Sequence, residues 1–287
     1  MPLESIKTEH IAAVIEAERQ RFGDCVKILD AGCGGCNLIQ NLHERLLKSK
    51  TVNNFEIYGF DVNDFKREGN FLDRPIHFLT NRYPEIPWQD RLKLVGQNDK
   101  WPFENQYFEV VISDQVVEHL KNHLFFFSEM ARVLSPTGFS LQSIPFREKV
   151  FDGHVSLPLA HKFKSYDFIY NFIYLFSLLG FGKYKEVGKR KGITISEYSI
   201  NQADYLVSKI NYLSRKEFLS LCKSLDLKVS YNYSTQFVFK ILRAKLTAYE
   251  LFKYNKQGYR FLDYLISIFV KYFKSMPVFI EKTKYAK

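Results

Sequence analysis

At 287 residues the chain is long enough to bury a large core, and one elaborated domain fits this length better than two. Its 41 Lys and Arg against 31 Asp and Glu give a net charge of +10, which favours an anionic partner such as a membrane surface, a nucleic acid or a phosphorylated substrate. Four cysteines and an N-terminus without a signal-peptide pattern argue against a secreted, disulfide-built domain and predict a reducing, cytoplasmic setting.

The first predicted elements are a leading helix, a strand and a second helix. Apolar positions recur at helical spacing over residues 3–22, so this stretch predicts an amphipathic helix that ends at Gly23. A β-branched run over 26–30 predicts a strand, and a helical pattern follows at 38–48. The chain must turn sharply between the two, which makes this turn the first candidate for a binding site.

The turn has the composition of a ligand cradle. Gly32, Gly34 and Gly35 carry no side chain that would keep a ligand from the backbone, and the helix start offers free N–H groups. Asp30 favours a ligand with a positively charged amino group over a pyrophosphate. The alternative is an ordinary tight connection. The Cys-x-x-Cys pattern at 33–36 lacks a second pair for a metal site, so we interpret it as small residues in a cramped turn.

A second acid supports a nucleoside ligand. Residues 55–61 predict another strand that ends in Asp61, the spacing at which a βαβ unit places a carboxylate on ribose hydroxyls. Asn37 stands where a nicotinamide fingerprint needs Gly or Ala. S-adenosylmethionine carries an amine, a carboxylate and a ribose, so it fits both acids. We expect Asp61 and Val62 at the ribose, and Asp30 with the glycine turn at the methionine end.

The third strand introduces the candidate adenine site. Residues 62–90 contain three prolines and predict irregular structure without a long helix. Residues 92–95 predict the third strand, and Gln97, Asn98 and Asp99 follow at its carboxyl end, the edge where open α/β sheets bind ligands. We expect these three side chains near the adenine, with simple loop polarity as the alternative.

The fourth strand ends at the same edge. Residues 110–113 form a continuous apolar run, which is typical of a strand buried on both faces. Ser113, Asp114 and Gln115 come at its end, beside the glycine turn, and we expect them to contact the cofactor. A helix over about 116–134 is predicted next.

Four motifs resemble the class I S-adenosylmethionine-dependent methyltransferases. They are a Leu-Pro-Phe-like turn, a Phe-Asp-Val-Val-like strand, a Leu-Glu-His-like helix start and an Arg-Val-Leu-x-Pro-Gly-Gly-like turn, at 101–103, 108–111, 117–119 and 132–138. The match covers about 25–146 and resumes weakly near 212. The resemblance implies a doubly wound, Rossmann-like α/β fold with a mainly parallel seven-stranded sheet and S-adenosylmethionine as cofactor. Gln97 stands where this family has an acid that binds adenine.

The rest of the chain divides around an insertion. We predict a cofactor-binding core with its N-terminal helix, an inserted substrate cap, the end of the core sheet and an aromatic, basic extension, at 1–146, 147–212, 213–244 and 245–287. A fifth strand is predicted at 139–145, and Ser214 is expected to cap the last core helix. Residues 228–233 and 236–242 are predicted as two antiparallel strands at the sheet edge.

Two aromatic segments suggest contact with a membrane. Residues 166–182 and 259–280 are apolar and flanked by lysines, but the first is short and interrupted by Asp167 and Asn171, so an interfacial or buried helix fits better than a transmembrane one. On a basic chain they favour anionic lipid headgroups. Packing on the protein itself or on a dimer partner is the alternative, and the oligomeric state is open.

Three histidines are candidate bases for a hydroxyl acceptor. His119 follows the fourth strand, and His154 and His161 open the insertion. Methyl transfer to an alcohol needs its proton removed, a task suited to a histidine of near-neutral pKa. We favour His154. His119 has a purely structural alternative, and His154 with His161 and Asp152 has the alternative of a metal site, although we predict no metal.

The sequence thus predicts an S-adenosylmethionine-dependent methyltransferase acting on a hydroxyl of a glycan or lipid-linked small molecule, peripheral to the inner face of the membrane. The short stretch at 153–158 resembles methyltransferases of bacterial surface polysaccharide biosynthesis. One alternative is a catalytically inactive cofactor-binding or membrane-associated scaffold, since Cys36 and Gln97 depart from the family pattern. The other is a nucleic-acid methyltransferase, and the absence of an Asn/Asp-Pro-Pro-aromatic motif after the fourth strand argues against it.

Overall fold

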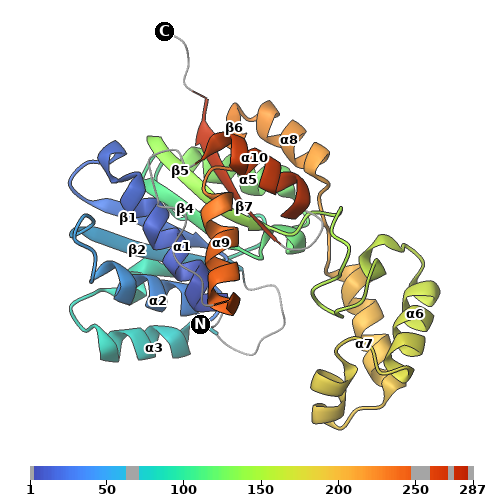
Figure 1. Ribbon diagram of the computed structural model, residues 1–287. Coiled ribbons are helices and arrows are strands. Elements are labelled where there is room, and N and C mark those ends of the chain that lie inside the picture. The colour runs from blue at the N-terminus through green and yellow to red at the C-terminus, as the bar shows by residue number, and fades with distance from the viewer. Residues whose placement is uncertain (1–2, 63–70, 247–258, 271–274, 284–287) are drawn as a thin grey trace.

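The computed structural model describes residues 3–62, 71–246, 259–270 and 275–283. Within them a seven-stranded sheet has the order β3-β2-β1-β4-β5-β7-β6, in which β7 is antiparallel to both of its neighbours (Figure 1). The strands are β1 Val26–Ala31, β2 Phe55–Val62, β3 Leu92–Val95, β4 Phe108–Asp114, β5 Leu134–Ile144, β6 Leu227–Ser230 and β7 Met276–Lys282. The predicted doubly wound, mainly parallel sheet is confirmed.

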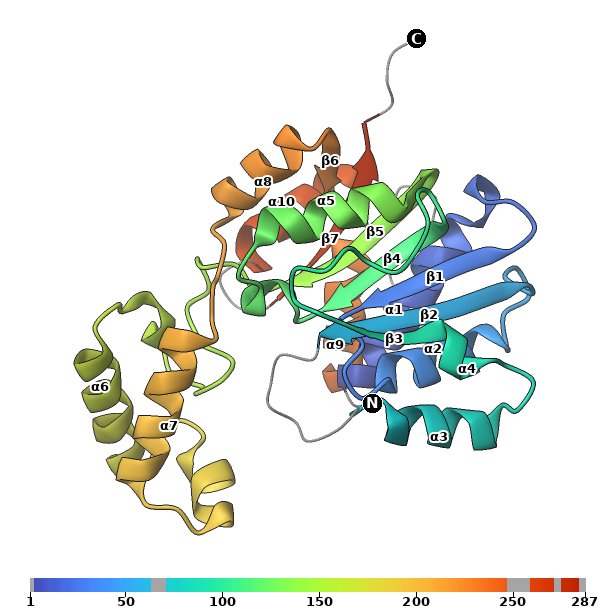
Figure 2. The ribbon, with the colours of Figure 1, turned by 180° about the vertical axis from the view of Figure 1, so that it is seen from behind.

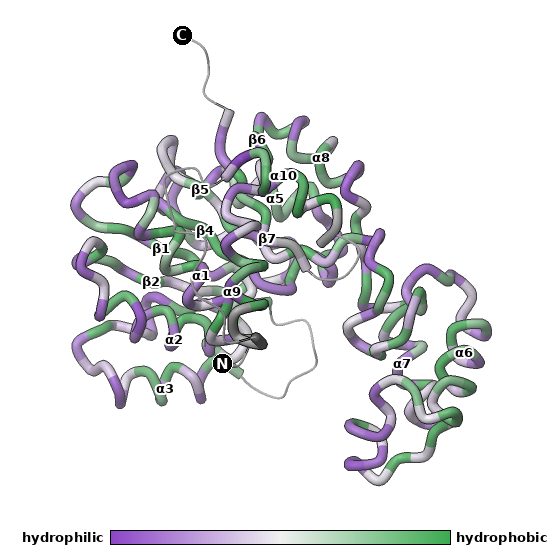
Figure 3. The backbone as a smooth tube through the Cα atoms, viewed as in Figure 1, coloured by the Kyte–Doolittle hydropathy of each residue, from purple (hydrophilic) through white to green (hydrophobic). Residues whose placement is uncertain are grey.

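Helices cover both faces of the sheet. One face carries α1 Leu3–Ala17, α2 Asn37–Leu46, α3 Asp73–Arg82 and α9 Ser234–Leu246 (Figure 1), and the other carries α5 His123–Val133 and α8 Arg215–Ser224 (Figure 2). The short α4 Trp88–Arg91 leads into β3, and α10 Arg260–Val270 packs against α9. Hydrophobic segments run along the central strands (Figure 3), and the two faces hold separate buried clusters.

Residues 147–212 build a cap that projects from the core (Figure 1). Its helices α6 Tyr166–Leu178 and α7 Ile195–Ser208 pack on each other around a hydrophobic cluster of their own. Thr194 and Ser214 start α7 and α8 with reciprocal capping boxes, as predicted for Ser214. Among the described residues, every helix is too short or too polar to cross a lipid bilayer.

The predicted strand over 236–242 is wrong, because these residues belong to α9. The buried Asp263 of α10 accepts hydrogen bonds from the backbone N–H groups of Tyr233 and Thr235, at 3.1 and 2.8 Å, and so satisfies free donors at the start of α9. The sheet is completed instead by β7, which lies between β5 and β6. The aromatic and β-branched composition of 236–242, which favours a strand, is therefore outweighed by a contact with a distant helix.

The prediction of irregular structure over 62–90 is wrong for α3. Pro75 lies in the first turn of this helix, where a backbone N–H has no intrahelical partner to lose. Residues 63–70 of this stretch lie outside the described residues, as do 247–258, 271–274 and 284–287 of the predicted C-terminal extension.

Candidate active site

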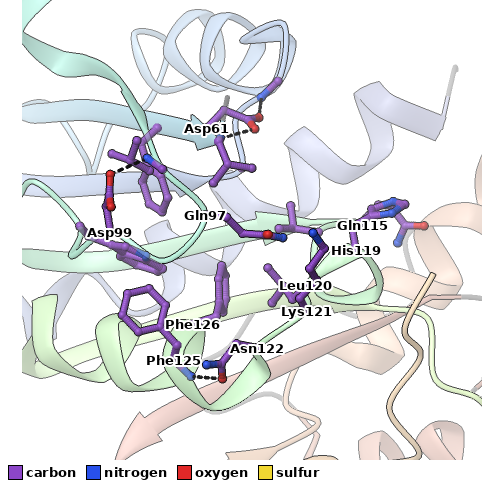
Figure 4. A pocket seen from close by; sticks show the side chains of 18 of the residues that line it. Asp61, Gln97, Asp99, Gln115, His119, Leu120, Lys121, Asn122, Phe125 and Phe126 are labelled. Atoms are coloured by element: carbon purple, nitrogen blue, oxygen red, sulfur yellow. Dashed lines mark hydrogen bonds between the residues drawn. The ribbon is translucent and has the colours of Figure 1, made fainter. Parts of the chain in front are cut away.

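A cavity of about 440 Å³ opens at the carboxyl ends of β1 to β4. The strand order reverses between β1 and β4, and such a switch point is where open α/β sheets bind ligands. The volume lies within the range of roughly 300–1,000 Å³ that is typical of small-molecule sites. In Figure 4 the Gln97 amide and the His119 ring lie between Asp61 on one side and Asn122 on the other.

The glycine turn forms one wall of the cavity. Gly32 and Gly34 have φ values of +89° and +51°, a region that residues with a Cβ rarely adopt. A Cβ on Gly32 would lie 2.4 Å from Cγ2 of Val116, whereas a Cβ on Gly35 would meet nothing within 4 Å. The turn therefore requires glycine at position 32 for its backbone and for its packing.

Asp61 is fixed against this turn. Its carboxylate accepts hydrogen bonds from the backbone N–H of Gly34, at 2.6 Å, and of Val62, at 2.7 Å. All three residues line the cavity. The carboxylate at the end of β2 and the side-chain-free turn after β1 thus share one cleft.

Asp30 lies behind the cavity wall and does not line it. Its side chain is buried, and its Oδ2 has no hydrogen-bond partner among the described residues. Burial, with smaller contributions from Asp114 and Asp61, raises the pKa of Asp30 to about 8. Acids of β1, β2 and β4 therefore gather around the glycine turn. A pKa of about 8 keeps Asp30 protonated at pH 7, so Asp30 adds a polar group behind the turn and no negative charge.

Of the three residues expected at the adenine, Gln97 and Asp99 line the cavity and Asn98 does not. The Asp99 carboxylate accepts from the Gly96 N–H at 2.9 Å, which holds the loop after β3 (Figure 4).

An aromatic wall on this side was missed in the sequence. The Trp101 ring lies 4.5 Å from that of Phe60 and 5.1 Å from that of Phe126, and all three line the cavity. The Trp-Pro-Phe turn and the Phe triplet at 125–127 were the available signals.

Of the three residues expected to contact the cofactor at the end of β4, two line the cavity and one does not. Asp114 lines the cavity and forms an ion pair with Lys7 of α1 at 2.7 Å. Gln115 lines it with a φ of +60° and donates from Nε2 to the Ser143 carbonyl oxygen at 3.2 Å. Ser113 is buried outside the cavity, and its hydroxyl donates to the side chain of Gln142.

Two of the three candidate histidines lie together. The predicted helix over 116–134 is split into a short 3₁₀ helix, η2 (Val117–His119), and α5. His119 lines the cavity, and the centres of the His119 and His154 rings lie 5.6 Å apart. Tyr205 of α7 also lines the cavity, with its ring 5.1 Å from that of His154. Burial lowers the pKa of both histidines, that of His154 to about 4, so both are neutral at pH 7.

His161 stands apart from this pair. Its Nδ1 lies 3.5 Å from Oδ2 of Asp152, its Nε2 lies 3.2 Å from the Arg147 carbonyl oxygen, and its ring contacts Tyr212. Asp152 also accepts from the backbone N–H of His154 at 2.7 Å. His161 therefore helps to hold the loop that carries His154 in place.

A second cavity of about 410 Å³ meets the first at Gln115, which lines both. It is bounded by the first cap loop, α9 and Lys7 of α1. Lys149, Asp152 and Gly153 of the cap loop line it. His154 follows Gly153 directly, so the histidine pair lies near the junction of the two cavities.

Residues 29–141, less than half of the chain, match a family model described as a methyltransferase domain. No curated protein matches the chain. Among solved structures, the trans-methyltransferase CalH with SAH is similar at 15% identity and a TM-score of 0.34, over 45% of this chain and 34% of that one.

Two further structures are similar over most of this chain. Geranyl diphosphate C-methyltransferase from Streptomyces coelicolor A3(2) is 13% identical, with a TM-score of 0.44 over 96% of this chain and 74% of that one. A possible histamine N-methyltransferase from Thermotoga maritima is 11% identical, with a TM-score of 0.41 over 98% and 91%. Likenesses this distant carry no argument about the acceptor.

Proposed function

We propose that this chain, whose residues 29–141 match a methyltransferase domain model, uses S-adenosylmethionine to methylate a hydroxyl group of a glycan or a lipid-linked small molecule. The observation that carries the proposal is the meeting of two cavities beside a pair of neutral histidines. One cavity suits the cofactor, and the other leaves room for an acceptor next to it.

The first cavity fits the cofactor on three counts. The glycine turn leaves the backbone accessible, the carboxyl groups of Asp61 and Asp114 in the lining favour a cationic arm, and the aromatic wall offers a flat surface for a base. We expect Asp61 to hold the ribose, Gln97 the adenine, and Asp114 with the glycine turn the methionine end. When bound, S-adenosylmethionine supplies an electrophilic methyl group.

The second cavity supports an acceptor that approaches from the cap. Transfer requires the acceptor oxygen to be aligned with the methyl group and kept from competing water. Gln115 lines both cavities, Tyr205 of α7 lines the first, and the cap loop lines the second, so an acceptor in the second cavity would lie next to the first. Neutral imidazoles beside that route can lower the cost of removing the hydroxyl proton.

The surface of the cap supports a lipid-linked acceptor. Five large apolar side chains on and just after α6 are at least half exposed: Phe168, Leu175, Leu178, Leu179 and Phe181. Lys185, Lys189, Arg190 and Lys191 follow and are exposed as well. Apolar groups beside cations favour an anionic membrane surface, which would bring a lipid-linked substrate to the second cavity.

The proposal is tested by incubating the enzyme with S-adenosylmethionine and candidate glycolipids, then searching by mass spectrometry for a product heavier by one CH₂. Methylation at a hydroxyl supports the proposal. Cofactor binding with no product on any acceptor fraction would favour the inactive scaffold, and methylated RNA or DNA would favour the nucleic-acid enzyme. Cosedimentation with anionic and with neutral vesicles tests the membrane part separately, with a Leu178→Asp variant expected to release the enzyme.

A further inference from the structure

Three potential ligands converge at the junction of the two cavities. Glu118, His119 and His154 each offer one nitrogen or oxygen atom, and these atoms all lie within 4.8 Å of one another. A metal held by bonds of about 2 Å separates its ligand atoms by roughly 3–4 Å, so small side-chain rotations would close the site. We call these three residues the junction cluster.

Glu118 is the unusual member of the cluster. Its side chain is 2% exposed, and its Oε2 has no hydrogen-bond partner among the described residues. A buried carboxyl oxygen without a partner is costly, and such atoms commonly mark a missing ion or ligand.

The surrounding contacts hold the three residues in place. His119 has its Nδ1 3.3 Å from the Lys209 carbonyl oxygen, an arrangement that favours a proton on Nδ1 and leaves Nε2 with a free lone pair. The backbone N–H of Asn211 donates to the Glu118 carbonyl oxygen at 2.7 Å. Asp152 accepts from the His154 N–H. The linker after α7 and the cap loop thereby position the cluster from both sides.

Nearby positive charge is offset by acids. Lys7 forms an ion pair with Asp114. Lys149 is buried and interacts with Asp152 and Glu118, and burial lowers its pKa. Among the described residues neither lysine forms an ion pair with Glu118, which leaves this carboxyl able to bind a second cation.

We propose that Glu118, His119 and His154 bind a divalent transition-metal ion at the junction of the two cavities. Two imidazoles and one carboxylate suit ions of the manganese-to-zinc series better than Mg²⁺ or Ca²⁺, and three protein ligands leave positions open for substrate oxygens. The ion's role in transfer rests on the proposed function. With the ion bound, His119 and His154 would serve as its ligands and would not accept the proton. The ion would hold the acceptor hydroxyl and lower its pKa, the proton would leave to water, the O–C bond would form and the S–C bond to the methyl group would break.

Metal binding is tested on the full, untagged chain after treatment with EDTA. Titration with Co²⁺ is expected to give visible absorption bands that saturate at one ion per chain, and calorimetry with Zn²⁺ and Mn²⁺ to give the same stoichiometry. Glu118→Gln and His154→Ala should weaken binding by more than roughly tenfold. His77→Ala, a histidine exposed on α3, is the matched control and should bind as the wild type does.

The outcomes separate the metal site from the proposed function. Circular dichroism and binding of S-adenosylhomocysteine verify that each variant is folded. The site is refuted if Co²⁺ does not saturate, or if both cluster variants bind it as tightly as the wild type. Stoichiometric binding without methyl transfer to any acceptor keeps the site and rejects the function. Methyl transfer at an unchanged rate in EDTA keeps the function and removes the ion's role in it.

Discussion

The two cavities that meet at Gln115 are built in different ways. The first is formed by the ends of parallel strands and the turns that follow them, so its position is set by the fold itself. The second is formed by a cap loop, α9 and α1, segments far apart in the sequence. The cavity that we propose for the cofactor thus belongs to the sheet, whereas the cavity that we propose for the acceptor belongs to segments inserted into the sheet or added around it.

The largest expected effect tests the cap's contribution to chemistry. His154→Ala should lower kcat by roughly 10²–10⁴-fold while leaving the Kd for S-adenosylmethionine nearly unchanged, because His154 lies near the junction and does not line the first cavity. His161→Ala is the control from the same loop. Equal losses of kcat in both variants would mean that the activity depends on the shape of the loop and that the His154 imidazole takes no part in the chemistry.

The next effect concerns the turn of the first cavity. Gly32→Ala places a Cβ at positive φ, which costs about 1–2 kcal/mol, and the new Cβ displaces Val116 as well. We expect cofactor affinity to fall by roughly 100-fold in calorimetry, which corresponds to about 3 kcal/mol. Gly35→Ala in the same turn should bind normally, since a Cβ there meets nothing. Comparable losses in the two variants would show that the turn tolerates no change at all.

Asp61→Asn should have a smaller effect on the same cavity. The amide keeps the shape of the side chain but removes one charged acceptor, and we expect the cofactor to bind roughly tenfold more weakly, or about 1.4 kcal/mol. Asp73→Asn, an exposed acid at the start of α3, is the control. Unchanged affinity in isothermal calorimetry would remove Asp61 from the ribose site.

The difference between the cavities also explains what the sequence could predict. The positions of Asp61 and Gln97 at the sheet edge could be predicted, because each residue follows a short apolar run and parallel strands end at one edge. The nearness of Glu118 to His154 could not be predicted, because it depends on how the cap loop returns to η2. For the same reason the final strand was misassigned: β7 is selected by its place between β5 and β6 and has no local turn signal.

The last prediction concerns stability in place of binding or activity, and it tests the acid behind the first cavity. Burial gives Asp30 a pKa of about 8 in the folded chain, whereas an exposed Asp has about 3.8. Between these values the unfolded chain has lost a proton that the folded chain keeps, so stability falls as pH rises from about 4 to about 8, by at most about 1.4 kcal/mol per pH unit. Asp30→Asn removes this contribution, and its melting temperature should fall less than that of the wild type between pH 5 and pH 8.

The same experiment separates Asp30 from other groups. Glu118, whose pKa burial also raises to about 8, contributes with the same sign in both proteins and cancels in the difference. Asp24→Asn, at an exposed position, should follow the wild type throughout. If the melting temperatures of Asp30→Asn and the wild type change with pH in the same way across this range, Asp30 is ionised in the folded chain and already paired with a cation. An ionised Asp30 would place a negative charge behind the first cavity, whereas the protonated form that its pKa implies at pH 7 places none there.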